Sequence, residues 1–219
     1  MIIAVDGPAG AGKSTVAKLL AQQLGFLYID TGAMYRALTL KALQQNTRID
    51  DSAKIIALAR ETGIDLVNYP DGSLGVILDG MDVSAAIREP RITKYVSEVA
   101  KIKEVRQVML KLQRQFGSLG NSVLDGRDIG TVVFPEAEKK FFLDADFSER
   151  VNRRFKELIG LGQAVTSEEV RSDLRNRDTI DSTREVAPLK KADDAIYIDT
   201  TGLTIKEVAE KLFSLVKHG

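Results

Sequence analysis

The sequence contains no cysteine and only a single histidine among its 219 residues. Without cysteine the chain has no disulfide framework and no thiolate ligands for a zinc site. The histidine, His218, is the penultimate residue, so we expect neither phosphohistidine chemistry nor a histidine metal site. No apolar run approaches the roughly 18 residues that a membrane-spanning helix needs, so we expect no membrane partner.

An excess of charge of either sign is also missing. Lysine and arginine total 31, as do aspartate and glutamate, and the formal net charge is zero. A general nucleic-acid binder needs a basic excess, so we expect no nucleic-acid partner. The first residues are strand-like and leave no room for a signal peptide, which makes the cytoplasm the expected location. Nothing marks an exposed apolar seam, so we expect a monomer.

The most informative segment is a glycine-rich stretch near the start of the chain. It reads G-x-x-x-x-G-K-S, the pattern of the phosphate-binding P-loop. The apolar run Ile2–Val5 before it predicts a buried strand, and Lys13–Leu24 predicts a helix. Free backbone N–H groups and the helix dipole then point at one place, which makes an anion site. We therefore expect ATP to bind Gly7, Pro8, Ala9, Gly10, Ala11, Gly12, Lys13, Ser14 and Thr15.

Two side chains of this segment have expected roles. Lys13 would reach the β- and γ-phosphates, and the Ser14 hydroxyl would ligate Mg²⁺. A glycine-rich turn before an ordinary helix is the alternative, and the complete pattern in its strand–helix setting argues against it.

Short apolar runs alternate with helical patterns along the rest of the chain. This is typical of a parallel sheet covered on both faces, whose ligands bind at the carboxyl ends of the strands. We predict an α/β fold with a five-stranded parallel sheet, whose strands all end in aspartate: Ile2–Asp6, Phe26–Asp30, Ser122–Asp125, Lys140–Asp144 and Ala195–Asp199. The predicted helices are Lys13–Leu24, Ala33–Gln44, Ser52–Thr62, Thr93–Phe116, Ser148–Leu158, Ser167–Arg177 and Ile205–Val216.

Two segments interrupt the alternation. Residues 64–90 carry two apolar runs around a Pro-Asp-Gly-Ser tip and predict an inserted β-hairpin. Seven arginines fall between residues 150 and 184. Because acidic residues are interspersed, a solvated, salt-bridged helix face is one interpretation. The other is a mobile lid that closes arginines over the transferring phosphoryl group.

Charged residues also gather after the second and third predicted strands. In Asp30–Arg36, Thr31 is a possible helix N-cap, and Arg36 is either a surface residue or a bidentate ligand for a second phosphate. In Asp125–Pro135, two carboxylates flank Arg127. An internally paired arginine–aspartate turn would explain this loop structurally, but so dense a charge cluster at a strand end favours function.

A third group of charges precedes the last predicted strand. Arg177, Asp181 and Arg184 are spaced by four and three residues and share one helix face if the helix continues that far. Ser97 and Arg106, by contrast, carry no spacing signal that singles them out.

Together these segments resemble bacterial-type cytidylate kinase, a P-loop nucleoside monophosphate kinase. Val5–Ser14, Asp30–Arg36 and Asp125–Pro135 look like three fingerprints of that family in order, and the last is the most specific. Ala187-Pro188-Leu189, with the charges before it, completes a resemblance that spans almost the whole chain. Thr31 stands where some members carry serine, and either hydroxyl suits the position.

The resemblance implies a single P-loop kinase domain over residues 1–219. Its core would comprise residues 1–30, 117–147 and 186–219. The monophosphate-binding region, which contains the hairpin, would comprise residues 31–116, and a helical lid would comprise residues 148–185.

The resemblance also implies transfer of the γ-phosphoryl group of ATP to CMP or dCMP, with Mg²⁺, in pyrimidine nucleotide metabolism. By similarity, Arg36, Arg127 and Arg184 would hold the CMP phosphate. Ser97, Arg106 and Asp128 would read the cytosine, and Arg177 and Asp181 would contact the sugar. The implied CMP site is Thr31, Arg36, Ser97, Arg106, Asp125, Arg127, Asp128, Arg177, Asp181 and Arg184. The implied catalytic side chains are Lys13, Arg127, Arg153 and Arg184, and the choice of lid arginine among 150, 153 and 154 stays open.

Two other functions remain open from the sequence. A kinase of the same fold acting on UMP, AMP or a small metabolite would need a different substrate-reading set around residues 97–128. A non-enzymatic P-loop switch usually carries a guanine-reading N-K-x-D sequence, and this chain has none. A switch would also not need arginines for two phosphate-bearing substrates.

Overall fold

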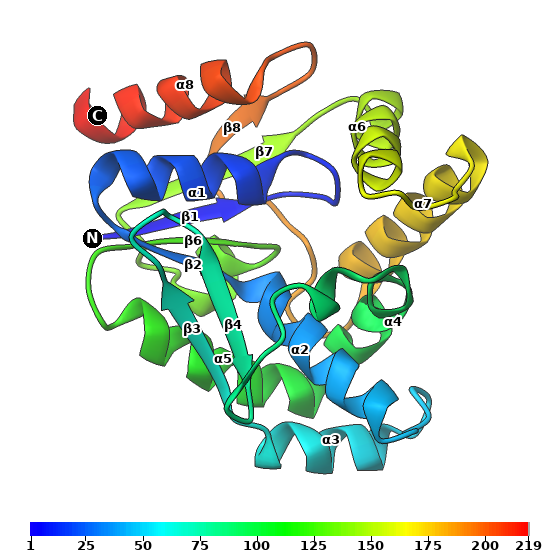
Figure 1. Cartoon of the computed structure of the whole chain (residues 1–219). Coiled ribbons are helices and arrows are strands. Elements are labelled where there is room, and N and C mark those ends of the chain that lie inside the picture. The colour runs from blue at the N-terminus through cyan, green and yellow to red at the C-terminus, as the bar shows by residue number, and fades with distance from the viewer. Residues whose placement is uncertain (219) are drawn as a thin grey trace.

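Five parallel strands pair in the order β2-β6-β1-β7-β8 in the computed structural model, which describes residues 1–218 (Figure 1). They are β1 (Ile2–Asp6), β2 (Leu27–Asp30), β6 (Ser122–Gly126), β7 (Lys139–Asp144) and β8 (Ile196–Asp199). The predicted parallel sheet is confirmed, and each strand end lies within one residue of its predicted position. The α/β fold class is confirmed with it.

The register of the sheet brings several strand-ending carboxylates to one level. β1 is central and pairs with β6 and β7. Val5 lies opposite Asp125 in β6, and Asp30 lies opposite Asp125 from the other side. Asp6 follows at the next position of β1, opposite Gly126. These aspartates therefore meet at the carboxyl edge of the sheet, as the strand pattern predicted.

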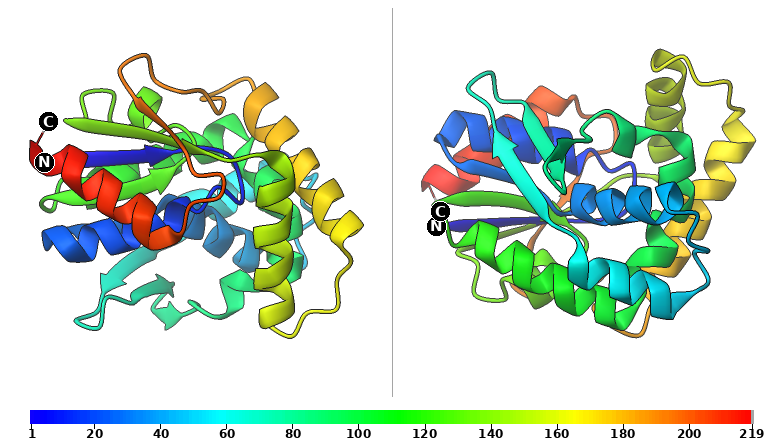
Figure 2. Two further views of the ribbon diagram at one scale, coloured as in Figure 1. Left: turned by 90° about the horizontal axis from the view of Figure 1, so that it is seen from above. Right: turned by 60° about the horizontal axis from the view of Figure 1, so that its bottom comes forward.

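Helices cover both faces of the sheet (Figures 1 and 2). The covering elements are α1 (Lys13–Leu24), α8 (Ile205–His218), α5 (Lys103–Gly117) and a short π-helical turn, η2 (Ile129–Val133). Ile3 and Val5 pack with α1 and α8, whereas Ala4 between them packs on the opposite face with η2 and α5. This alternation is why strands buried on both sides are apolar at every position.

The chain between β2 and β6 builds an additional layer beside the sheet. Its elements besides α5 are α2 (Thr31–Gln44), α3 (Ser52–Glu61), β3 (Ile64–Asn68), β4 (Leu74–Leu78), β5 (Met81–Asp82), η1 (Ala86–Arg88) and α4 (Pro90–Ala100). β3 and β4 pair antiparallel, which confirms the predicted hairpin, and β5 adds a third strand. The buried side chains of these elements form a core of their own, which includes Met34, Leu38, Ile55, Ile92 and Met109.

The single helix predicted over Thr93–Phe116 is wrong. The chain forms α4, which begins at Pro90 and ends at Ala100, and then α5, which begins at Lys103. Ile102 between them is extended, with φ −69° and ψ 120°. The reason is tertiary packing: α4 packs mainly against α2 and reaches α7, whereas α5 packs mainly against α3 and reaches η2 and β2, and both contact α2. One straight helix would not reach both sets of partners.

Two helices, α6 (Phe147–Gly160) and α7 (Ser167–Thr183), pack together beyond the carboxyl edge of the sheet (Figure 2). Their apolar cluster includes Ala9 of the P-loop. A capping box between Thr166 and Glu169 starts α7, which runs past its predicted end. None of the helices within residues 1–218 combines the length and the apolar character that crossing a membrane requires.

Candidate active site

A cavity of about 560 Å³ opens at the carboxyl edge of the five-stranded sheet. Nine lysine and arginine residues and five acidic residues line it, although the whole chain has no net charge. This local excess of cations favours anionic ligands. The predicted site residues that line it are Ala9, Gly10, Gly12, Lys13, Ser14, Thr15, Thr31, Arg36, Ser97, Arg106, Asp125, Arg127, Asp128, Arg177, Asp181 and Arg184. Those that do not are Gly7, Pro8, Ala11 and Arg153.

The P-loop connects the end of β1 to the start of α1. Gly7 has a φ of 145°, and a Cβ there would lie 1.9 Å from Leu143 O, so only glycine fits against β7. Lys13 turns back across the loop and donates to Pro8 O at 2.6 Å. Burial and then Arg127 hold the pKa of Lys13 well below its usual value. A phosphate beside Lys13 would oppose that shift, because it supplies the anion that the buried ammonium lacks.

The Ser14 hydroxyl is held by a buried carboxylate. Ser14 donates to Asp125 Oδ2 at 2.7 Å, and the Tyr28 hydroxyl donates to Asp125 Oδ1 at 2.8 Å. Burial, followed by the charge of Asp30, raises the pKa of Asp125 to about 6. Across residues 1–218 no cluster of three or more histidine, cysteine or acidic side chains could hold a metal. One serine hydroxyl with an outer carboxylate fits Mg²⁺, which takes few protein ligands and keeps water and phosphate oxygens.

Asp30, not Thr31, caps helix α2, so the predicted N-cap is wrong. The backbone of Asp30 is extended. Its carboxylate accepts hydrogen bonds from the Ala33 N–H at 2.8 Å and from Arg36 Nη2 at 3.0 Å. Thr31 is already helical, and its hydroxyl instead donates to Asp125 O at 2.7 Å. The buried Nε of Arg36 has no hydrogen-bond partner within the described residues. A guanidinium held on one side and unpartnered on another favours an anionic ligand.

A carboxylate at the end of β1 anchors the loop after β6. Asp6 accepts from the N–H groups of Ile129 and Gly130, both at 2.8 Å. Burial is the main cause that raises the pKa of Asp6 to about 7. Because Asp128 directly precedes these two residues, Asp6 positions the backbone that carries Asp128.

Asp128 pairs with two buried arginines, Arg106 of α5 and Arg184 at the end of α7. Arg106 also donates through Nη1 to Ala100 O at 3.3 Å, the carbonyl that ends α4. Because α4 ends at Ala100, its last carbonyl is available to position the Arg106 guanidinium. Ser97, on the last turn of α4, lines the same cavity. The structure therefore brings together the three residues that the family resemblance implies for the base.

Three arginines, Arg127, Arg177 and Arg184, act on the carboxylate of Asp181. Arg127 Nε donates to Asp181 Oδ2 at 2.9 Å, and Arg184 Nη1 lies 3.7 Å from Oδ1. Burial opposes ionisation of Asp181, but Arg127, Arg184 and Arg177 outweigh it and hold its pKa below the usual value. Burial and then Arg127 lower the pKa of Arg177 to about 10, and its Nε lacks a partner among residues 1–218. Like Arg36, it suits an anion.

The three candidate lid arginines of α6 differ in their contacts. Arg153 donates to Thr200 Oγ1 at 3.0 Å and Thr200 O at 2.6 Å and does not line the cavity. Arg150 is buried and donates to Ala9 O at 3.0 Å. Of the three, Arg154 lines the cavity. The catalytic role of Arg153 stays a prediction.

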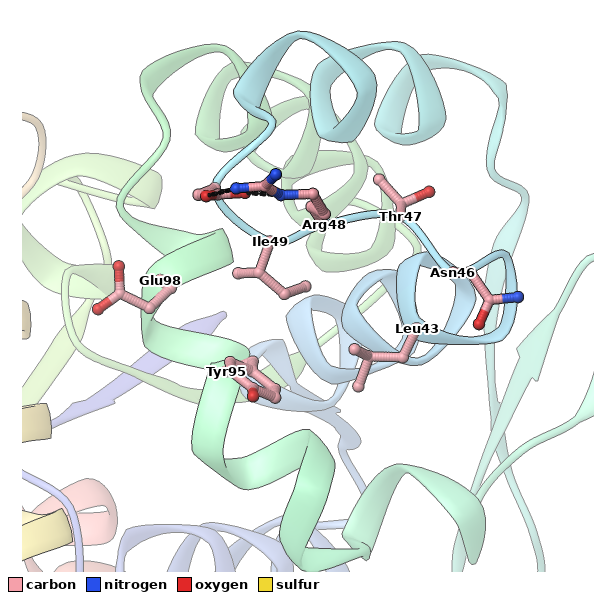
Figure 3. A pocket seen from close by; sticks show the side chains of 8 residues that line it. Leu43, Asn46, Thr47, Arg48, Ile49, Tyr95 and Glu98 are labelled. Carbon is pink, nitrogen blue, oxygen red and sulfur yellow. Dashed lines mark hydrogen bonds and ion pairs between the residues drawn. The ribbon is translucent and has the colours of Figure 1, made fainter.

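A second cavity, also about 560 Å³, lies beside the end of α2 and the middle of α4 (Figure 3). Leu43, Ile49 and Tyr95 form its apolar part. Arg48 lies on its rim and pairs with the exposed Asp50 at 2.6 Å. This cavity shares no lining residue with the first and contains none of the predicted site residues.

Comparison with known proteins identifies the family. The family model of cytidylate kinase matches residues 3–218. The chain belongs to the cytidylate kinase family. The cytidylate kinase of Bacillus licheniformis is 50% identical over 216 residues, covering 99% of this chain and 96% of that protein. That of Caldanaerobacter subterraneus is 52% identical over 215 residues, covering 98% and 94%. Membership of the cytidylate kinases confirms the predicted family and the predicted kinase activity.

A solved structure supports the fold independently. An uncharacterized protein from Eubacterium ventriosum superposes with a TM-score of 0.56, covering 100% of this chain and 99% of that one, at 12% identity. At so low an identity the likeness concerns the fold alone.

Sequence reasoning assigned no role to Tyr28, which lines the cavity of this cytidylate kinase, or to Asp6, which anchors the loop that carries Asp128. Both lie in strands that the apolar pattern predicts correctly. Their side chains meet partners that lie 97 and 123 residues away, respectively. The one available signal was their position in strands that end at the predicted active edge, which does not reveal those partners.

Proposed function

We propose that the protein transfers the γ-phosphoryl group of ATP to CMP or dCMP, releasing ADP and CDP or dCDP. The observation that carries this proposal is one cationic cavity that combines a P-loop with two arginines, Arg36 and Arg177, whose buried Nε atoms lack partners within residues 1–218. The P-loop suits a triphosphate, and the arginines suit a second phosphate. Membership of the cytidylate kinase family supports cytosine as the base.

Each part of the chain has a place in this proposal. Residues 31–116 receive CMP, residues 148–185 close as a lid, and residues 1–30, 117–147 and 186–219 form the core. The apolar contact between the lid helices and Ala9 supports the lid role. Closure would exclude water, which otherwise competes with CMP as phosphoryl acceptor.

ATP would lie along the P-loop, with its phosphates facing the backbone N–H groups at the start of α1. Lys13 would contact the β- and γ-phosphates. Ser14 would contribute its hydroxyl oxygen to Mg²⁺ while donating its proton to Asp125, as it does at 2.7 Å. When bound, the ion neutralises charge on the phosphates.

CMP would lie between the P-loop and the α4–α5 junction. Its phosphate would meet Arg36, Arg127 and Arg184, and Thr31 and Asp125 would support that side of the site. Its sugar would contact Arg177 and Asp181. Ser97, Arg106 and Asp128 would read the cytosine edge, where the Asp128 carboxylate suits the exocyclic amine.

The chemistry needs positioning rather than a general base. The attacking group is a CMP phosphate oxygen, which is ionised at neutral pH, so no side chain has to remove a proton. Catalysis then consists of in-line placement and neutralisation of the transferring group by Lys13 and the arginines.

The test is ADP release in a coupled assay with ATP, Mg²⁺ and each of CMP, dCMP, UMP, AMP and GMP. We expect turnover with CMP and dCMP well above the others, and loss of turnover when EDTA removes Mg²⁺. Preference for another monophosphate would keep the phosphate contacts but overturn the roles of Ser97, Arg106 and Asp128. No turnover with any of the five would overturn the proposed reaction.

A further inference from the structure

Tyr28, in the edge strand β2, donates a hydrogen bond to the Asp125 carboxylate, which in turn accepts one from Ser14. Its side chain is 6% exposed, and its ring belongs to the core under α1. Its hydroxyl donates to Asp125 Oδ1 at 2.8 Å, while Asp125 Oδ2 accepts from Ser14 at 2.7 Å. Both oxygens of this buried carboxylate are therefore engaged, and its rotation is restricted from two sides.

The backbone of Tyr28 is fixed as well. Its N–H donates to Asn68 Oδ1 at 2.9 Å, and its carbonyl accepts from Asn68 Nδ2 at 3.2 Å. The Asn68 carboxamide, at the end of β3, thus pairs with the free edge of β2 as a peptide group of a neighbouring strand would. On its other side, Tyr28 lies opposite Val123 of β6. The hydroxyl is therefore presented to Asp125 from a rigid support.

The position of Asp125 needs such support. Asp30 lies opposite it in the sheet register, and two neighbouring carboxylates repel each other. Without the Tyr28 hydroxyl, the hydrogen bond from Ser14 alone would hold the Asp125 carboxylate against this repulsion. If that bond broke, the Ser14 hydroxyl would lose its acceptor. Its hydrogen could then point toward the phosphates, in the direction of the lone pair that would bind Mg²⁺.

We propose that Tyr28 is a positioning residue for the metal side of the phosphate site: it orients Asp125, which orients the Ser14 hydroxyl with a lone pair free for Mg²⁺. This inference rests on the proposed function, because it takes Ser14 as a ligand of Mg²⁺. Residues that orient a metal ligand from outside typically change metal affinity by about 10–100-fold when they are removed.

The experiment is calorimetric titration of the full chain with ADP, in the presence of Mg²⁺ and in the presence of EDTA. The ratio of the two affinities measures how strongly the ion supports nucleotide binding. We expect Tyr28→Phe, which removes only the hydroxyl, to reduce this ratio by about tenfold. The affinity for ADP in EDTA should change much less than this ratio, because the Ser14 hydroxyl then has no ion to meet. That second value also reports that the variant is folded.

Two further variants sharpen the result. Tyr197→Phe removes a hydroxyl from β8, where the side chain is 52% exposed, and should leave the ratio unchanged. Asp125→Asn should reduce the ratio, and the double variant with Tyr28→Phe should lose little more, because both changes act on one hydrogen-bonded unit.

Three results would overturn the inference. A wild-type ratio in Tyr28→Phe would mean that the hydroxyl does not position the site. Equal losses of affinity with Mg²⁺ and with EDTA would mean that Tyr28 only supports the fold. If ADP binding by the wild type does not respond to Mg²⁺ at all, the metal assignment of the proposed function fails and this inference with it.

Discussion

Arg150 and Asp178 form an ion pair, with 2.5 Å between Nη1 and Oδ2, that joins helices α6 and α7. The pair also encloses the P-loop. Arg150 donates to Ala9 O at 3.0 Å, and Asp178 accepts from the Ala9 N–H at 3.3 Å. Gly10 has a φ of 78°, which favours glycine, and a Cβ there would lie 3.1 Å from Arg150. Helices α6 and α7 are thus joined to the P-loop at Ala9.

Breaking that ion pair should destabilise the fold. Asp178→Ala leaves the buried Arg150 without its closest carboxylate, and we expect a loss of about 1–3 kcal/mol in the free energy of unfolding. For a chain of this size, this corresponds to a melting temperature lower by roughly 3–10 °C, measurable by circular dichroism. Glu168→Gln is the matched control, because it breaks an exposed lid pair with Arg171 at 3.8 Å. Equal effects of the two variants would contradict the prediction.

Removal of Lys13 should damage turnover more than ATP binding. The Lys13 ammonium is placed to meet charge that develops on the transferring phosphoryl group, whereas backbone N–H groups bind the ground state. We expect Lys13→Ala to lower kcat by about 10²–10³-fold. Steady-state kinetics and direct titration with ATP separate the two effects. A variant that loses ATP affinity but keeps its turnover would refute this role.

Asp128→Ala should weaken the binding of CMP far more than the binding of ATP. Its carboxylate is held between Arg106 and Arg184, neither of which belongs to the P-loop. We expect the KM for CMP to rise by about 10–100-fold, the worth of one charge-assisted hydrogen bond. The KM for ATP should change little. Asp128→Asn, which keeps the shape, serves as the comparison, and equal losses for both nucleotides would make Asp128 structural.

Arg154 and Arg153 should differ in their effect on catalysis. Arg154 lines the cavity, whereas Arg153 is bound to Thr200. We expect Arg154→Ala to lower kcat by about 10²-fold and Arg153→Ala to lower it much less. Single-turnover measurements with saturating ATP and CMP would check this. A larger loss in Arg153→Ala would support the catalytic role that the family resemblance implies for Arg153, which would then have to leave Thr200 on closure.

Asp6 should make stability depend on pH. Its pKa is raised by burial from 3.8 to about 7, so the unfolded chain releases this proton first as the pH rises. Asp6 therefore contributes stability below about pH 4, and that contribution is lost progressively up to about pH 7. The stability of Asp6→Asn relative to wild type should accordingly rise over this interval, by up to about 4 kcal/mol, and stay constant above it. Urea denaturation at a series of pH values measures the difference, and a constant difference would count against the prediction.

Some parts of the structure were predictable because their signals are local. Strands buried on both faces need apolar runs, and the five predicted runs are the five strands of the sheet. The break within Thr93–Phe116 has no local signal, because the intervening Lys101-Ile102 contains neither proline nor glycine. The N-cap assignment to Thr31 failed for a similar reason: Asp30 and Thr31 are both good caps, and sequence does not show which one is extended.

By itself the sequence determined the fold class, the family and the phosphate-binding loop. Those depend on consecutive residues: the glycines, Lys13 and Ser14 lie on one short stretch between a strand and a helix. Only the tertiary structure decided which charged groups meet. The pairing of Asp6 with residue 129, of Tyr28 with Asp125, and of Arg150 with Asp178 each joins separate elements. Such contacts depend on how strands and helices pack against one another, and spacing along the chain does not show which distant side chains that packing brings together.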